Sequence, residues 1–97
     1  MLKTGSFCIE YIFEIKGRGI VFGGRIVDGF ISSKNYLRII TKNKTVLLKI
    51  KSIEGIRHSR LDNVNTGLVL DETVIKLDEL KDLIETPNTF EIISCNK

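Results

Sequence analysis

The stretch that decides the fold is "IKGRGIVFGGRIVDG", Ile15 to Gly29, which holds five of the chain's eight glycines and two arginines. A glycine-rich run beside basic residues can cradle a phosphate, but only where a helix follows and aims its N-terminal amides at the anion. Here the glycines are followed by "RIV" and the turn signal Asp28-Gly29. We therefore expect these glycines to permit turns and bends of the backbone, and we expect the chain to bind no nucleotide and no cofactor.

Alternating apolar residues around this stretch predict β-strands. The first strand has Phe7, Ile9 and Phe13 at one parity, which favours a place for Phe13 in the core. The predicted strands span residues 7–15, 20–27, 36–40, 45–56, 66–70 and 89–95. Short strands separated by glycine-containing turns are typical of a small closed antiparallel β-barrel. The fold class is therefore all-β, and the absence of a βαβ pattern excludes the α/β class.

Two interruptions of the alternation predict bulges. Ile12 breaks the first pattern, which places a bulge near Glu10 and Tyr11. The parity also slips between Ile50 and Ile53, which places a bulge or bend near Ser52.

The glycines predict turns and a corner. Gly17 and Gly19 flank Arg18 and are expected at positive φ in a turn. Gly23 and Gly24 are expected to form a bend that lets a neighbouring strand approach closely. Asp28-Gly29 is a strong signal for a two-residue hairpin.

The segment before Pro87 can be interpreted in two ways. Leu77, Leu80 and Leu83 have helical spacing, which allows a helix of three turns. The alternative is one helical turn at Asp78–Lys81 followed by a short strand at residues 83–85.

Composition places the chain among ordinary globular domains, and we expect one domain spanning residues 1–97. No apolar run approaches the roughly 20 residues that span a membrane, and Glu10 and Glu14 interrupt the first apolar segment. We therefore expect a cytoplasmic protein, which favours reduced thiols at Cys8 and Cys95 over a disulfide. Two cysteines and one histidine do not make a zinc site, so no metal is expected.

Charge is distributed unevenly along the chain, whose net charge is +3. Residues 16–60 contain eleven lysines and arginines against two acids, while residues 71–91 contain seven acids and two lysines. A basic body fits an anionic partner, and nucleic acid is the commonest such partner. The lysines of the basic run have a plainer interpretation, as outward side chains that protect strand edges and keep the protein soluble: Lys42, Lys44, Lys49 and Lys51.

The glycine stretch also carries a family resemblance. "FEIKGRGIVFGGRIVDG" resembles F-x-I-x-G-R-G-T-V-V-T-G-R-V-E-x-G in the second domain of translational GTPases, the barrel of elongation factor Tu and its relatives. "IKSIEGIRHSRLDNVNTGLVL" and "LIETP" are similar to later parts of that domain, so the resemblance covers residues 7–87. It implies a closed barrel of six or seven strands and favours the short helical turn at Asp78–Lys81. It does not imply GTPase activity, because in the family a separate domain with its own phosphate loop binds the nucleotide.

The resemblance also implies contact residues, because in elongation factor Tu this barrel helps hold the aminoacylated end of transfer RNA. Glu10 and Phe13 fall on the acid and the phenylalanine of the family's E-D-V-F run, with Tyr11 in place of the aspartate. Glu54 falls on the acid of its I-E-M run, and Arg57 on a basic residue three positions later. Carboxylates can accept from ribose hydroxyls, arginines can pair with phosphate, and aromatic rings can stack on bases. The arginines expected to meet RNA are Arg18, Arg25, Arg57 and Arg60.

The sequence thus predicts a non-catalytic module that binds RNA, either a transfer RNA end or a ribosomal element. The alternative is a protein-interaction or self-associating domain that binds no nucleic acid. An enzyme would need His58 with Glu54 or Asp62, but no serine or cysteine partner stands at a recognisable spacing. We therefore do not expect catalysis.

Overall fold

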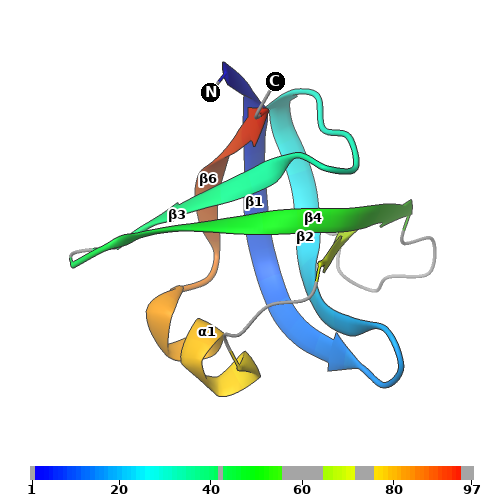
Figure 1. Ribbon diagram of the computed structural model, residues 1–97, viewed down its shortest axis with the longest axis vertical. Helices are drawn as coiled ribbons and strands as arrows, with labels where there is room; N and C mark the ends of the chain where they lie inside the picture. Colours follow the sequence, from blue (N-terminus) through cyan, green and yellow to red (C-terminus); the bar gives the residue numbers. More distant parts are fainter. Residues whose placement is uncertain (1, 42, 56–64, 72–75, 95–97) are drawn as a thin grey trace.

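The computed structural model describes residues 2–41, 43–55, 65–71 and 76–94. Its elements are β1 (Leu2–Ile15), β2 (Gly19–Gly29), β3 (Tyr36–Ile40), β4 (Thr45–Gly55), β5 (Thr66–Leu70), α1 (Leu77–Leu83) and β6 (Asn88–Ser94). The strands close into an antiparallel barrel in the order β1-β2-β5-β4-β3-β6 (Figure 1). The closed all-β barrel predicted from the sequence is confirmed.

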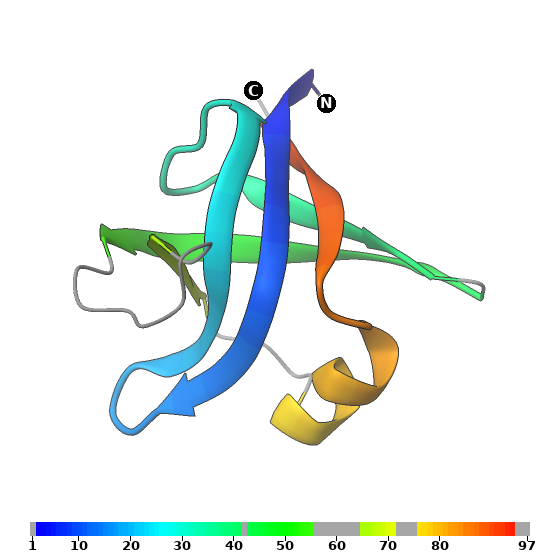
Figure 2. The ribbon, with the colours of Figure 1, turned by 180° about the vertical axis from the view of Figure 1, so that it is seen from behind.

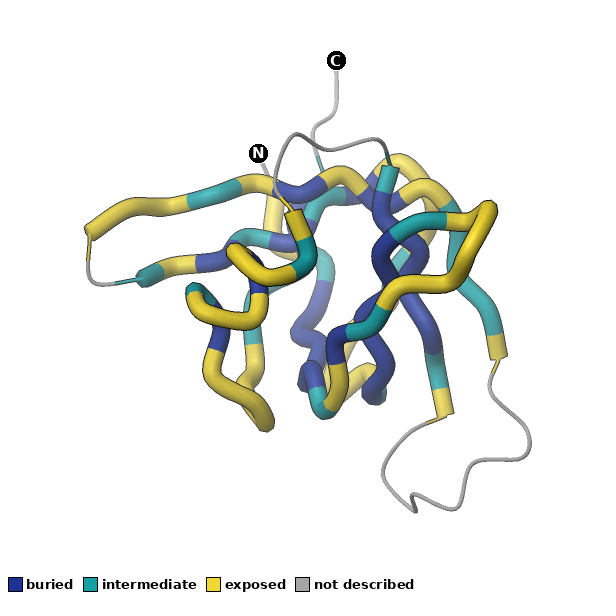
Figure 3. Tube along the Cα trace, turned by 90° about the horizontal axis from the view of Figure 1, so that it is seen from below, coloured by how far each residue is buried: buried dark blue, intermediate teal, exposed yellow. Residues whose placement is uncertain are grey.

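Two strand pairs form opposite walls of the barrel. β3 and β4 cross in front of β1 and β2 in Figure 1, and the view from behind in Figure 2 brings β1 and β2 to the front. The β3–β4 hairpin extends beyond the body of the barrel, as Figure 3 shows from below. The outsides of the two walls are therefore separate surfaces of the molecule.

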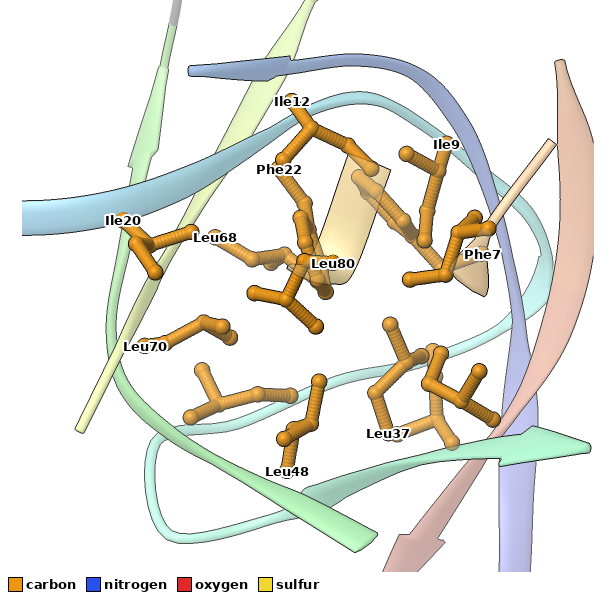
Figure 4. Close-up of a cluster of buried hydrophobic side chains, with 14 residues drawn as sticks. Phe7, Ile9, Ile12, Ile20, Phe22, Leu37, Leu48, Leu68, Leu70 and Leu80 are labelled. Carbon is orange, nitrogen blue, oxygen red and sulfur yellow. The ribbon is translucent and has the colours of Figure 1, made fainter. Parts of the chain in front are cut away.

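The core fills the space between these walls. Phe7, Ile9, Phe22 and Leu37 are fully buried in it, and Figure 4 shows their side chains converging with those from other strands. Leu80 reaches the same cluster from α1 and is also fully buried. The helix therefore contributes to the core through one deeply inserted side chain.

The bulge expected near Glu10 and Tyr11 is confirmed, but one inference drawn beside it is wrong. The β1–β2 register shifts between Ile9 and Tyr11, so the inward position passes to Ile12, which is buried. Phe13 is therefore turned away from the core and is only partly buried. The second expected irregularity is also present, as a register shift between Ile50 and Ser52.

The two-residue hairpin predicted at Asp28-Gly29 does not form. Asp28 and Gly29 remain paired with β1, opposite Ser6 and Gly5, and the next strand, β3, pairs with β4 and β6 instead of β2. Gly29 has φ 71°, and a Cβ there would overlap the carbonyl oxygen of Thr4. This glycine therefore permits close packing on β1 at the end of the strand, after which the chain crosses the barrel.

The helix is short and contains the predicted Asp78–Lys81 turn. It runs from Leu77 to Leu83, about two turns, so it is shorter than the three-turn alternative. Leu83 is helical and Ile84 is its C-cap, so the alternative strand at residues 83–85 does not form. Within the described part of the chain, no helix is long and apolar enough to cross a membrane.

The positive φ expected at Gly17 and Gly19 is confirmed, with values of 84° and 104°. A Cβ at Gly19 would meet no atom within 4 Å, so a substitution there tests backbone strain alone. We expect Gly19→Ala to lower the free energy of unfolding by about 1–2 kcal/mol, measured by urea denaturation. Gly55→Ala is the control, because Gly55 also has an open environment and no positive φ. Equal stability of the two variants would contradict the strained turn.

Candidate functional site

Strand register gathers residues from four strands on the outside of the β1–β2 wall. Side chains alternate between the two faces of a strand, so the neighbours of the inward Ile12, Phe22 and Leu68 face outward. One outward row across the sheet is Tyr11, Gly23, Gly67 and Glu54, and the adjacent row is Phe13, Val21, Val69 and Ser52. Val21 and Val69 in the second row are almost fully buried, so the exposed part of this wall is at Tyr11 and at the ends of the rows. With strands about 4.8 Å apart, each row spans roughly 14 Å.

Several residues predicted as contacts lie on or beside these rows. Phe13 and Glu54 belong to them, Arg25 follows Gly23 along the outside of β2, and Glu10 lies in the β1 bulge. Arg18 is in the turn between β1 and β2, and its guanidinium pairs with the Glu54 carboxylate. We call this the β1–β2 surface: Glu10, Tyr11, Phe13, Arg18, Arg25 and Glu54. The other predicted contacts, Arg57 and Arg60, lie outside the described residues, as do His58 and Asp62 of the rejected enzyme site.

The Arg18–Glu54 ion pair joins the β1–β2 turn to the end of β4. Both side chains remain partly exposed, at 48% and 36%, so the pair adds little to stability but fixes both charged groups. The backbone N–H of Arg18 donates to the Ile15 carbonyl at 2.9 Å, and this hydrogen bond stabilises the turn. A guanidinium held in this way can still offer its other N–H groups to an anion.

Arg25 has a side-chain donor that finds no acceptor among the described residues. Its Nε is buried, and it forms no hydrogen bond with the described part of the chain. Arg25 lies opposite Cys8, whose buried free thiol donates to Glu10 Oε2 at 3.4 Å. Leaving a buried N–H without an acceptor costs about 1–3 kcal/mol. Arg25 as a whole is partly exposed, so the other N–H groups of its guanidinium can bind an anion.

Sequence reasoning did not select Tyr11 as a contact residue, although the structure places it on this surface. Tyr11 is 46% exposed and is the aromatic end of the row that leads across two glycines to Glu54. The signal that could have found it was the predicted bulge, because a bulge before Tyr11 reverses which residues face outward. The two glycines of the row could be recognised only from the register of β5.

A cavity of about 780 Å³ adjoins this surface at Arg18. Its lining contains equal numbers of basic and acidic side chains: Arg18, Lys51 and Lys76, and Glu14, Asp71 and Asp78. Such a mixed lining does not favour an anion over a cation. Among the described residues, no group of histidines, cysteines and carboxylates is arranged to hold a metal ion.

Comparison with known proteins finds sequence similarity to a translation factor. In an alignment of 86 residues that covers 84% of this chain, the sequence is 30% identical to a translation initiation factor IF-2 of Amoebophilus asiaticus (strain 5a2). Fold and sequence both fit a translation-factor-like barrel domain. The match spans 9% of the initiation factor's length, so the translation-factor-like barrel corresponds to one part of that protein. No protein-family model and no solved structure matches the chain.

Proposed function

We propose that this translation-factor-like barrel is a non-catalytic cytoplasmic module that binds RNA through the β1–β2 surface. Residues 7–87 correspond to the second domain of translational GTPases. The whole chain of 97 residues acts as one such domain. Its target is a transfer RNA end or a ribosomal element. The proposal is supported by the resemblance of the glycine stretch and by the similarity to an initiation factor.

The observation that carries the proposal is the unused donor of Arg25 on a surface that also presents Tyr11, Phe13 and Arg18. Phosphate oxygens are strong acceptors for a guanidinium. Exposed aromatic rings stack on unpaired bases with little dependence on base identity. The Glu54 carboxylate, which pairs with Arg18, has the chemistry to accept from a ribose hydroxyl. The surface therefore combines the groups that single-stranded RNA recognition uses.

Arg25→Gln is the sharpest test of this surface. The probe is a fluorescein-labelled 12-nucleotide single-stranded RNA ending in CCA, followed by fluorescence anisotropy from ~50 to ~500 mM salt. Each phosphate contact to a single strand contributes about 0.7 to the slope of log K against log salt. Relative to ~1 M salt, where this contribution vanishes, the loss of one contact therefore lowers affinity by up to roughly eightfold at ~50 mM. The melting temperature should equal or exceed that of the wild type, because the substitution removes an unsatisfied buried donor.

The control is Lys44→Gln. Lys44 borders a small cavity that it shares with Glu79 and Asp82, and these carboxylates disfavour a phosphate there. Its substitution removes the same charge and should leave RNA affinity unchanged. Absence of RNA binding by the wild type at ~50 mM salt, or an equal loss in both variants, would overturn the proposal.

A second candidate function, self-association or a protein partner, is favoured by one apolar region. Leu2 and Phe30 are 60% and 66% exposed, and Val27 is 46% exposed. Phe30 is held beside the start of β1 by its N–H, which donates to the Thr4 carbonyl at 3.1 Å. Analytical ultracentrifugation of the wild type and of Phe30→Ser tests this function, which predicts an oligomer that the substitution dissociates.

A further inference from the structure

The outside of the β3–β4 wall is a second surface with a distinctive composition. Tyr36 and Arg38 alternate with the buried Leu37 and Ile39, and they therefore face outward. On β4, Lys49 precedes the buried Ile50 and faces outward in the same way, and Lys51 lies in the register shift between Ile50 and Ser52 and is exposed. Tyr36 is directly opposite Lys49 in the register. The strand pairing thus places an aromatic ring among basic side chains.

Lys34 adds a third lysine at the same place. Its backbone N–H donates to the Ile50 carbonyl at 3.0 Å, and the Ile50 N–H donates to the Asn35 carbonyl at 2.8 Å. Lys34 therefore lies beside the segment of β4 that carries Lys49 and Lys51. We call this the β3–β4 surface: Lys34, Tyr36, Arg38, Lys49 and Lys51.

Positive charge predominates on and around this surface. Arg38 Nη1 lies 3.3 Å from Glu91 Oε1, and the same carboxylate is 3.8 Å from Lys3 Nζ. Lys49 Nζ is 4.0 Å from Asp71 Oδ2, at the limit of an ion pair. Within the residues that the structure describes, no ion pair involves Lys34 or Lys51. Five cationic side chains and two carboxylates therefore lie here, but Lys51 also lines the cavity at Arg18 together with Glu14, Asp71 and Asp78. The unbalanced positive charge is therefore greatest at Lys34.

The backbone of Lys34 supports a role for its side chain. Lys34 has φ 77°, a left-handed conformation that costs a residue with a Cβ roughly 1–2 kcal/mol and that glycine and asparagine adopt more readily. The surrounding hydrogen bonds hold this conformation, because Asn35 Oδ1 also accepts from the Ser32 N–H at 2.7 Å. A lysine here is therefore an unfavourable choice for the backbone, and what it provides is a positive charge beside Lys51.

We propose that the β3–β4 surface is a second RNA-binding surface that contacts the phosphate backbone and stacks one base on Tyr36. This inference rests on the proposed function, because it assigns to the same RNA a further contact on the opposite wall. Lys34, Lys49 and Lys51 meet successive phosphates as point charges. Arg38, fixed by Glu91, borders the base that stacks on Tyr36. The surface reads no sequence, since phosphate and stacking contacts are tolerant of base identity.

The test uses the same RNA probe and salt titration with four variants. Lys34→Asn removes a charge and keeps a residue that tolerates positive φ, so RNA affinity should fall by up to roughly eightfold at ~50 mM salt while the melting temperature is unchanged or higher. Lys51→Gln should lower affinity by a similar factor, and each variant should reduce the salt slope by about 0.7. Tyr36→Phe should bind as the wild type does, whereas Tyr36→Ala should bind more weakly. Lys44→Gln again serves as the matched control.

The outcomes separate this inference from the proposed function. If Arg25→Gln weakens binding but Lys34→Asn and Lys51→Gln bind as Lys44→Gln does, the β3–β4 surface is overturned and the β1–β2 surface stands. If the lysine variants weaken binding and Arg25→Gln does not, the second surface is supported and the first fails. If the wild type binds no RNA, both proposals fall.

Discussion

Gly24→Ala is expected to destabilise the barrel by about 4 kcal/mol or more, a large fraction of the ~5–15 kcal/mol stability of a typical domain. A Cβ at Gly24 would overlap the carbonyl oxygen of Cys8, and it would lie 2.9 Å from the Cys8 carbonyl carbon and 3.2 Å from Phe7 Cε2. Two of these atoms belong to the backbone of β1, so no side-chain rotation can relieve the overlap. β1 would have to separate from β2 beside the bulge that follows Ile9.

Thermal unfolding followed by circular dichroism measures this effect. For a domain of this size, each kcal/mol lowers the melting temperature by about 4–8 °C, so Gly24→Ala should melt at least ~16 °C below the wild type. Gly55→Ala is the matched control, because a Cβ there has no atom within 4 Å and should change the melting temperature little. A Gly24→Ala protein that melted with the Gly55→Ala control would disprove the close approach of β1 and β2.

The barrel could be predicted from the sequence because its signals are local. Alternation identified the strands, and breaks in alternation identified the register shifts after Ile9 and after Ile50. The shifts between Lys3 and Gly5 and between Ser6 and Phe7 were not predicted. The glycine pair at 23–24 was expected to permit a close approach, and Gly24 does so at Cys8. The short helix could also be predicted, because Leu77, Leu80 and Leu83 recur at a spacing that places them on one face of a helix.

The errors arose where a local signal depended on pairing that the sequence does not display. Asp28-Gly29 has the composition of a tight hairpin, but β2 keeps its pairing with β1 through Gly29, and this leaves no partner for a two-residue turn. Phe13 was assigned to the core by counting parity from Phe7. The bulge predicted between them reverses that parity, so the two expectations were inconsistent and the bulge decides.

The candidate surfaces were predictable only in part for the same reason. Glu54 was chosen from a resemblance, and Arg18 and Arg25 were chosen as basic residues that could meet phosphate, but the register of β2, β5 and β4 is what brings Arg25 and Glu54 to one wall. On the other wall, Lys49 and Lys51 had been interpreted as solvated lysines. Their position near Tyr36 and Lys34 depends on how β3 pairs with β4. The left-handed backbone of Lys34 could not be predicted, because neither a lysine nor the residues beside it signal a positive φ.

Leu80→Ala is expected to lower the free energy of unfolding by about 2–5 kcal/mol, the range for truncating a fully buried leucine. Leu80 is the one residue of α1 that is fully buried, and it belongs to the core cluster whose side chains Figure 4 shows around it. A helix of seven residues is too short to be stable in water without tertiary contacts. The substitution should therefore leave a cavity in the barrel and also loosen α1.

Two measurements separate these consequences. Urea denaturation gives the global loss, and amide hydrogen exchange reports whether protection in α1 falls further than protection in β1 and β2. Lys81→Ala is the control on the same helix, since Lys81 is exposed and alanine is the best helix former. Leu80→Met, which nearly conserves volume, should cost less than about 1.5 kcal/mol. If Leu80→Ala were as stable as Lys81→Ala, α1 would be an appendage on the barrel, and the core would have to be complete without it.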